Sequence, residues 1–545
     1  MKEDRGAWRS RLGFILAAAG SAVGLGNLWK FPYLTYKFGG GEHGNGAGGF
    51  VAIYLLAVIF LGVPVMIAEV MIGRRGRLNP VGSFRALRPA TAWKYAGLLG
   101  VVTGVLILSY YAVVAGWAIE YVGKSITWEY ANYDAQVTDK AVQSRIFDEE
   151  AAHSPIGIMF LKDHRLIKDN AGPKEIQKAW AGLKKNKQSE KLLKQAKKAL
   201  FLSFKARFHT QKALKHAMIE KKMEIYPDLL FNRFLDNPVK QIAYFFIFMA
   251  LTMLVVIGGV SSGIERWNKV LMPLLLAMLL ILVGRVFTLN GGVRALHFLF
   301  YPDFSTITFN TVLWAVGQAF FSLSLGMGAL LTYGSYLPKD AKISKSVVAI
   351  ISLDTLVALS AAFVIFGSIF TFGLTMSGSG IGNLFTAVPV IFLHMPGGRF
   401  LSIMFYSLVA FAALTSTVSL MEVAAAYLID EHAIPRKKAV LIAGSIIFAI
   451  GVPSALSFNI LAHAKAFGLT FFGLVDFFSA NIALPLGGIL IAIFVGWILT
   501  SKEKHEEVFE FPAWLYSIWN FLVRFIAPVA ILVVLVVLLT GRVSG

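Results

Sequence analysis

Two apolar segments of the chain carry glycine and serine where a lipid-facing helix would carry bulky side chains. One is Gly20–Asn27, with the sequence GSAVGLGN, and the other is Ser322–Gly328, with the sequence SLSLGMG. Glycine destabilises a helix interior by about 1 kcal/mol relative to alanine, so a helix could be interrupted at each run. An interruption frees backbone carbonyls and N–H groups, which can bind a cation and an anionic group. Close packing of small residues between helices would explain the same glycines.

Other apolar segments offer side-chain oxygens for the same chemistry. Asp354 lies within the apolar stretch 350–366, where an ionised carboxylate costs at least about 2.5–3.5 kcal/mol. It could coordinate a cation, or it could be a neutral acid in an interhelical hydrogen bond. Thr415 and Ser416 are adjacent hydroxyls, and such hydroxyls more often bond to the preceding helical turn. Asn27 could likewise bond to a neighbouring helix.

The composition of the chain indicates that lipid surrounds these segments. Of its 545 residues, 57% are hydrophobic and only 15% are charged, whereas a soluble protein carries about 25% charged residues. Spanning segments must pair their own backbone groups, so the fold is predicted to be all-α. The absence of cysteine excludes disulfides and thiolate metal sites.

Eleven segments are long and apolar enough to cross a hydrocarbon core about 30 Å thick. They run approximately over 11–37, 47–73, 94–124, 239–259, 265–289, 308–337, 344–373, 399–430, 438–456, 467–499 and 513–541. The two glycine-containing segments are the first and sixth, which are corresponding members of two five-helix halves. Paired interruptions of this kind are typical of inverted-repeat transporters with a site near the membrane midplane. The sequence therefore predicts two inverted-topology repeats, helices 1–5 and 6–10, with helices 1 and 6 unwound.

The formal net charge of +20 is concentrated in particular loops. Residues 73–94 contain six basic side chains and no acidic one, and smaller basic clusters begin at Arg266, Lys339 and Arg436. These loops fall on the same side of the predicted spans, which is the positive-inside pattern. We therefore expect a cytoplasmic amino terminus, an extracytoplasmic carboxyl terminus and no nucleic-acid binding.

A polar and basic stretch interrupts the spans between residues 128 and 236. Topology places it outside the membrane, where long loops translocate largely regardless of charge. It could be a solvated, partly helical layer, a helix lying on anionic lipid, or a docking site for a partner. The predicted organisation is thus 1–127 with spans 1–3, the extracytoplasmic insert 128–236, 237–499 with spans 4–10, and 500–545 with a cytoplasmic loop and span 11.

Ordered motifs along nearly the whole chain outside this insert resemble those of a known family. They are Trp8, Arg11–Gly13, Ala22–Asn27, Phe31-Pro32, Pro64, Glu69, Gly73-Arg74, Tyr110-Tyr111, Gly263–Arg266, Gly317–Gly326 and Leu414–Ser416. The chain resembles the neurotransmitter:sodium symporters, and its eleven-span layout resembles the bacterial amino-acid transporters among them. The resemblance implies sodium-coupled amino-acid import by alternating access, in a multi-pass protein of the bacterial inner membrane.

The resemblance also implies two sodium sites. The first would use Ala22, Asn27, Ser322, Asp354 and the carboxylate of the substrate. The second would use the carbonyls of Gly20, Val23 and Ala412 with the hydroxyls of Thr415 and Ser416. Many relatives have asparagine at the position of Asp354, and the chloride-dependent ones recruit an anion nearby. We expect Asp354 to supply that charge, so that chloride is not required, although Tyr54, Gln318 and Ser322 occupy the other chloride-site positions.

By the same resemblance, one set of residues surrounds a bound amino acid. It comprises Ser21, Ala22, Leu25, Gly26, Ile107, Tyr111, Phe321, Ser322, Ser324, Met327, Ser416 and Leu420. This lining is mostly apolar and has no acid or base for a charged side chain, so neutral, hydrophobic substrates are expected. Met327 between two glycines could adapt to an aromatic side chain.

Two pairs of charged residues match gate positions of the family. Lys30 and Asp476 would form the outer gate, above a lid of Tyr111 and Phe321, while Arg5 and Asp430 would form the inner gate. Lysine lacks the planar fork of arginine, so the outer pair should be loose. Glu69 is expected to bond an interrupted helix rather than to ligate an ion.

Two other functions fit part of the sequence. A sodium channel would need a continuous polar lining, and a sensor or receptor could keep this fold and signal through the insert. No nucleophile–base pair, metal cluster or nucleotide motif predicts an enzyme. The oligomeric state is left open by the sequence.

Overall fold

The computed structural model describes residues 6–39, 46–132, 142–144, 155–163, scattered positions between 166 and 205, 211–305, 307–374 and 380–539. Within these residues the fold is helical, and the one β-type pairing is an isolated bridge between Ala466 and Leu469. The all-α prediction is therefore confirmed for the described part of the chain. Arg5 lies outside the described residues.

The chain divides into two compact units. One contains residues 1–126, 234–384 and 396–545, and the other contains 127–233 and 385–395. In the second unit, α8 (Pro155–Asp163) and most of α11 (Gln211–Leu235) are helical. Phe231 stacks on Phe385 there, with ring centroids 5.5 Å apart.

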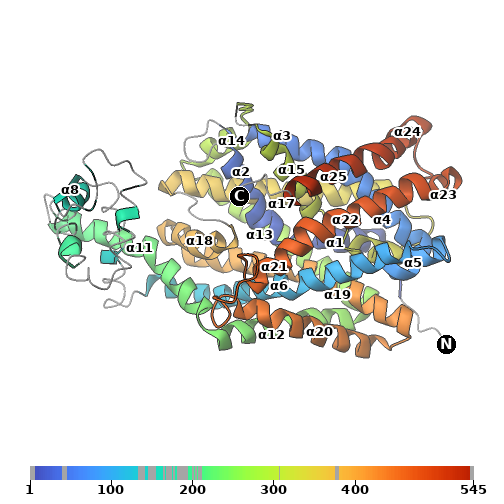
Figure 1. The fold of residues 1–545 in the computed structure, drawn as a ribbon, viewed down its shortest axis with the longest axis horizontal. Helices are drawn as coiled ribbons and strands as arrows, with labels where there is room; N and C mark the ends of the chain where they lie inside the picture. The colour runs from blue at the N-terminus through green and yellow to red at the C-terminus, as the bar shows by residue number, and fades with distance from the viewer. Residues whose placement is uncertain are drawn as a thin grey trace. The chain divides into compact units, whose positions relative to one another are not determined.

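The first unit holds the candidate membrane spans (Figure 1). Nine helices of the described residues are long and apolar enough to cross a membrane, and a bent pair makes ten. They are Gly48–Gly76 (α3 to α4), Lys94–Thr127 (α6), Pro238–Ile257 (α12), Val260–Phe287 (η6 and α13), Ile343–Phe372 (α17), Gly398–His432 (α19), Arg436–Leu456 (α20), Phe471–Ile498 (α21 to η9) and Ala513–Leu539 (α24 to α25). Shorter helices of this unit lie between them in the chain, namely α5 (Pro80–Leu87), α14 (Gly292–Phe300) and α23 (Ser501–Glu507), whereas most of α18 (Asn383–His394) belongs to the second unit.

The bent pair is the predicted first span. Helix α1 (Arg11–Ala22) ends at the glycine-rich run, and the chain becomes helical again at Gly26, through the π-turn η1 (Gly26–Lys30) into α2 (Phe31–Phe38). The two parts are inclined by 51°. Helix α1 packs against α13, α17 and α19, so its broken end lies inside the helical unit.

The predicted sixth span consists of two separate helices. Helix α15 (Phe309–Ser322) ends at the second glycine run and α16 (Ala329–Ser335) follows it. Each is too short to cross a membrane by itself, so the predicted total of eleven requires both to be counted as one span. Between them Ser324, Gly326 and Gly328 have φ values of 54°, 81° and 76°, a conformation that favours glycine.

Small-residue packing, the other explanation for the glycines, is present as well: a Cβ atom at Gly326 would lie 2.4 Å from the Leu484 carbonyl oxygen, and the same kind of contact joins two other helices. A Cβ atom at Gly73 of α4 (Val63–Gly76) would lie 1.9 Å from the Leu331 carbonyl oxygen, and one at Gly334 would lie 2.6 Å from that of Val70. Helices α4 and α16 therefore touch backbone to backbone. Glu69 of α4 accepts a hydrogen bond from the Gly326 N–H at 3.2 Å, which confirms its predicted structural role.

The basic cluster that begins in the last turn of α4 is largely paired with acidic side chains. Arg74 and Arg75 form ion pairs with Glu507 and Glu506 at 2.6 and 2.9 Å. Arg88 holds Glu503 of α23 with two parallel hydrogen bonds of 3.0 and 2.7 Å. Helix α23 therefore ties the segments on either side of α5 to the chain before the last span.

This pairing predicts a pH-dependent contribution to stability. Hydrogen bonds from Arg88 lower the pKa of the Glu503 carboxyl to about 2, below the value of about 4.3 in an unfolded chain. Glu503 should therefore stabilise the fold above about pH 4, and this stabilisation should be lost as the pH falls toward 2. The Glu503→Gln variant should melt a few degrees lower than the unmodified protein at pH 7, with the difference shrinking toward pH 3.

A matched control is available on the same helix. Glu506 pairs with Arg75, but its side chain is 48% exposed, and exposed ion pairs contribute little. Glu506→Gln should leave the melting temperature nearly unchanged across the same pH range. Equal effects of the two substitutions would contradict the role assigned to the Arg88–Glu503 pair.

Candidate functional site

The break in the first span exposes backbone groups at the centre of the helical unit. Val23 adopts an extended conformation with ψ of 101° and ends α1. The Gly24 N–H donates to the Asn27 side-chain oxygen at 3.1 Å, and the Leu25 N–H donates to the Tyr111 hydroxyl at 2.9 Å. These N–H groups no longer pair within a helix, so an anionic group could compete for them.

One cluster of oxygens surrounds the hydroxyl of Ser416 on α19. Its Oγ atom lies 3.2–3.3 Å from four backbone carbonyl oxygens, those of Gly20, Ser21, Val23 and Ala412. A hydroxyl has one proton to donate, so the Ser416 hydroxyl can satisfy only one of these four carbonyl oxygens at a time. The other carbonyl oxygens point toward the same place without a strong hydrogen-bond donor. The Thr415 hydroxyl is 3.0 Å from the Ala412 carbonyl oxygen. The five residues predicted for the second sodium site are thus brought together, with Ser21 added.

A second cluster surrounds Asp354 of α17, which is fully buried. The Ser322 hydroxyl lies 3.0 and 2.8 Å from the two carboxylate oxygens, and Asn27 Nδ2 lies 2.7 Å from one of them. The side chains that interact with this carboxyl are Asn27, Ser322 and Tyr54, so no basic residue of the described chain balances it. A buried carboxylate without a counter-charge is costly, and a bound cation would remove that cost. Ala22, the fourth predicted ligand, lines the adjoining cavity with Ser322.

A cavity of about 380 Å³ lies between the two oxygen clusters. It falls within the 300–1,000 Å³ typical of small-molecule sites. Eleven of the twelve predicted substrate residues line it: Ser21, Ala22, Gly26, Ile107, Tyr111, Phe321, Ser322, Ser324, Met327, Ser416 and Leu420. Leu25 does not, and lines the outer cavity instead. None of the residues lining the inner cavity is acidic or basic.

Gly24 completes the inner lining, although it was not in the set of residues predicted to surround the substrate. A Cβ atom at this position would lie 2.7 Å from the Tyr111 hydroxyl and 2.8 Å from the Ser416 hydroxyl. The glycine therefore lets the chain approach both groups. The signal was present in the sequence, because Gly24 is at the centre of the predicted interruption.

A second cavity, of about 1,300 Å³, adjoins the inner one, and we call it the outer cavity. Tyr111 and Phe321, the two residues predicted to form a lid, line both cavities. Lys30 and Asp476, the predicted outer pair, both line the outer cavity. Lys30 Nζ lies 4.1 Å from the centroid of the Phe321 ring, so the predicted outer cation rests on the aromatic lid.

At the amino-terminal end of the first span, aromatic side chains pack together. Trp8 is buried, donates its indole N–H to the Tyr333 carbonyl at 2.9 Å, and packs edge-on against Tyr333 and Tyr336. Asp430 accepts a hydrogen bond of 2.6 Å from the Asn79 N–H. Because Arg5 is outside the described residues, the inner pair stays a prediction.

Comparison with known proteins places this geometry in context. The model of the sodium:neurotransmitter symporter family matches residues 5–156 and 202–543. An uncharacterized sodium-dependent transporter of Bacillus subtilis, YhdH, is 33% identical over 97% of this chain and 96% of its own length. An uncharacterized sodium-dependent transporter of Haemophilus influenzae is 29% identical over 98% of each chain.

A solved structure is also similar over nearly its whole length. The crystal structure of MhsT in complex with L-phenylalanine matches with a TM-score of 0.74 and 36% identity, covering 98% of this chain and 99% of that one. The predicted resemblance is confirmed, and the family consists of sodium-dependent membrane transporters rather than enzymes. By the extent of the family match and the identity of its relatives, the chain belongs to the sodium:neurotransmitter symporter family.

Proposed function

We propose that this protein is a sodium-coupled symporter that imports neutral, hydrophobic or aromatic amino acids by alternating access. One observation supports this most directly. Ser322 and Ser416 both line the inner cavity, and each belongs to one of the two oxygen clusters. A substrate in the cavity would therefore touch both cation sites, which couples its binding to that of sodium.

We assign the two clusters to two sodium ions. The first would be held by Ala22, Asn27, Ser322, Asp354 and the substrate carboxylate, and the second by Gly20, Val23, Ala412, Thr415 and Ser416. Moving one charge through 100 mV is worth about 2.3 kcal/mol. Two sodium ions carried with a zwitterion would gain about 4.6 kcal/mol, which supports roughly 2,000-fold accumulation.

The substrate class follows from the lining of the inner cavity. Its side chains away from the backbone break are Ile107, Phe321, Met327 and Leu420, and no charged group is present in this lining to pair with a charged substrate side chain. The MhsT structure contains L-phenylalanine, which supports an aromatic substrate at this level of similarity. The carboxylate would take the place near the Leu25 N–H and the Tyr111 hydroxyl.

The remaining expectations complete the proposal. Counting α15 and α16 as one interrupted span gives eleven spans in two inverted five-helix repeats. The protein would lie in a bacterial inner membrane with its amino terminus inside and its carboxyl terminus outside. Lys30 with Asp476, and Arg5 with Asp430, would close the outer and inner sides in turn.

The decisive experiment is binding by the purified protein against all twenty amino acids, with and without sodium. Leucine, methionine and the aromatic amino acids should bind only with sodium, whereas lysine, arginine, aspartate and glutamate should not compete. In proteoliposomes an inward sodium gradient should drive accumulation above the external concentration. Sodium-independent binding would refute the coupling. Sodium-dependent binding without uptake would favour a sensor, and sodium flux without amino-acid accumulation would favour a channel.

A further inference from the structure

Two basic side chains lie near each other where the last two spans are joined. Lys504 belongs to α23, and Arg524 belongs to the π-turn η10 (Leu522–Ile526) of the last span. Lys504 is only 3% exposed, and its ammonium donates a hydrogen bond of 2.6 Å to Asn520 Oδ1. Burial lowers the pKa of the Lys504 ammonium, and the positive charge of Arg524 lowers it further. The two cations therefore repel each other across a short distance.

No carboxylate of the described residues balances this pair of cations. None of the ion pairs formed within the described part of the chain includes Lys504 or Arg524. The three carboxylates of α23 pair with arginines of the segment 74–88 instead. The Nε atom of Arg524 is buried and has no hydrogen-bond partner among the described residues. A buried donor of this kind calls for an acceptor from outside the chain.

Aromatic rings hold the guanidinium of Arg524 in a fixed orientation. Its Cζ atom lies 4.1 Å from the centroid of the Trp497 ring and 5.4 Å from that of Phe525. The Trp497 indole N–H also donates to the Arg524 carbonyl at 3.0 Å. Stacking on a ring occupies the face of a guanidinium and leaves the N–H groups along its edge for an anion. A phosphate group matches that edge with two parallel hydrogen bonds.

Tryptophans mark this end of the last two spans as a boundary between membrane and water. Trp497 is 52% exposed near the end of the span Phe471–Ile498, and Trp514 is 66% exposed at the start of the span Ala513–Leu539. Exposed tryptophans at the ends of spans lie at the level of the lipid headgroups. In Figure 1, α23 and α24 (Ala513–Phe521) lie at the same end of the helical unit. The cation pair is thus placed where lipid phosphates are found.

An exposed apolar stripe continues from this level along the last span. Five of its side chains, spaced three or four residues apart, are 43–62% exposed: Ile518, Phe521, Phe525, Val529 and Leu532. Large exposed apolar side chains of a membrane-spanning chain face hydrocarbon. Phe525 belongs both to this stripe and to the ring pair beside Arg524. An anion with acyl chains can therefore occupy the cation pair and the stripe together.

We propose that Lys504 and Arg524 bind the phosphate of an anionic phospholipid, whose acyl chains lie along the exposed stripe of the last span. The phosphate accepts a hydrogen bond from Arg524 Nε and offsets the repulsion between the two cations. Because α23 also holds Arg88 through Glu503, the bound lipid strengthens the joint between α23 and the last span. This inference does not rest on the proposed function.

The test compares variants that each remove one positive charge from this region. Lys504→Gln and Arg524→Gln remove the two proposed ligands of the phosphate. Lys502→Gln is the matched control, because Lys502 is an exposed residue of the same helix. A general attraction of anionic lipid to a basic surface would be weakened equally by the substitutions at Lys502 and Lys504.

The first measurement is lipid binding by the purified full-length protein in a neutral detergent, followed by native mass spectrometry. Dioleoylphosphatidylglycerol is the probe, and dioleoylphosphatidylcholine, which has the same chains and no net charge, is the comparison. Loss of a charged hydrogen-bonding group should weaken binding of the phosphatidylglycerol at least about tenfold in Lys504→Gln and Arg524→Gln. Lys502→Gln should bind it as the unmodified protein does. Equal binding of the two lipids, or equal effects of all three substitutions, would overturn the proposal.

The second measurement is the melting temperature in each lipid, which separates lipid binding from a loss of folding. Phosphatidylglycerol should raise it by several degrees relative to phosphatidylcholine in the unmodified protein and in Lys502→Gln, and by less than half as much in Lys504→Gln. If Lys504→Gln lowered the melting temperature equally in both lipids, Lys504 would have a structural role only, and the proposal would fail. An equal rise with 10 mM inorganic phosphate in phosphatidylcholine would assign the site to free phosphate and overturn the lipid as its ligand.

Discussion

Replacing Ser416 with alanine is expected to lower the sodium affinity of amino-acid binding by roughly 10- to 100-fold. The hydroxyl lies among the carbonyl oxygens of Gly20, Val23 and Ala412, where it would share the coordination of the second sodium ion. A hydrogen-bonding group that interacts with a charge is worth about 1.5–3 kcal/mol, and each 1.4 kcal/mol is a factor of ten. The measurement is the sodium concentration for half-maximal binding of a labelled amino acid.

The adjacent Thr417 provides the control for this substitution. Its hydroxyl bonds to the Leu414 carbonyl at 3.0 Å and lies 2.9 Å from the Thr252 hydroxyl of α12, away from the oxygen cluster. Thr417→Ala removes one buried hydroxyl from the same helix and should leave the sodium curve where it was. A Ser416→Ala protein with an unchanged sodium requirement would show that the carbonyl cluster is not a sodium site.

The second large effect is expected from Asp354→Asn. Uptake by the unmodified protein should be the same when chloride is replaced by gluconate, because the Asp354 carboxylate would supply the negative charge beside the proposed first sodium ion. The neutral amide removes that charge while keeping the shape of the side chain. Uptake by the variant in gluconate should therefore fall at least about tenfold, which corresponds to 1.4 kcal/mol, and chloride should restore part of it.

Asp340 gives a matched comparison, since it is an exposed residue outside the helices. Asp340→Asn should leave uptake independent of chloride. Two results would contradict the role proposed for Asp354. One is loss of uptake by the unmodified protein in gluconate, and the other is full, chloride-independent uptake by Asp354→Asn.

The sequence predicted the two helix interruptions from two signals, the local weakness of the glycine runs and their placement in the first and sixth spans. Glycine lowers helix stability wherever it occurs, and Gly326 and Gly328 adopt the positive φ angles that glycine tolerates. The pairing of Glu69 with the Gly326 N–H could be anticipated for a related reason. A lone carboxylate in an apolar helix needs a donor, and an interrupted helix offers free N–H groups.

Leu25 was predicted to line the inner cavity, but Gly24 lines it instead. The sequence could not predict this difference. Between Val23 and Gly26 the chain is neither a continuous helix nor a strand, so no fixed periodicity says which side chain faces the cavity. The π-turn η1 then adds a residue to the turn and rotates the side chains after it. Those orientations depend on Tyr111 and Ser416, which are distant in sequence.

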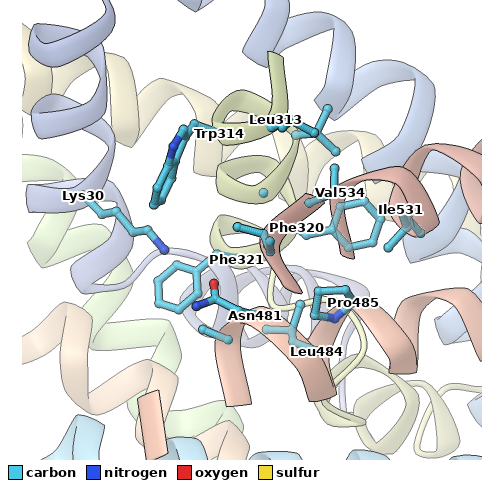
Figure 2. A pocket seen from close by; sticks show the side chains of 14 residues that line it. Lys30, Leu313, Trp314, Phe320, Phe321, Asn481, Leu484, Pro485, Ile531 and Val534 are labelled. Carbon is cyan, nitrogen blue, oxygen red and sulfur yellow. The ribbon is translucent and has the colours of Figure 1, made fainter. Parts of the chain in front are cut away.

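A cavity of about 600 Å³ between α15, α22 (Leu484–Ile493) and α25 (Ala527–Leu539) was not predicted from the sequence (Figure 2). It depends on how α25 lies against α15 and α22. The chain near these contacts contains the π-turns η8 (Ser479–Ala483) and η10 (Leu522–Ile526). Each π-turn shifts the register of the side chains after it, and the apolar composition of these segments does not record such shifts.

The backbone contact of Gly73 and Gly334 with the facing helix has a mechanical consequence. With 1.9 Å between a Cβ at Gly73 and the Leu331 oxygen, α4 and α16 have no layer of side chains to slide on. Any movement of one of these two helices should therefore carry the other with it. Helix α15 packs on α3, which is the other end of the same Gly48–Gly76 span, so both halves of the sixth span lie along one partner. The segment Leu323–Gly328 joins these two halves, and an amino acid in the inner cavity would touch it at Ser324 and Met327.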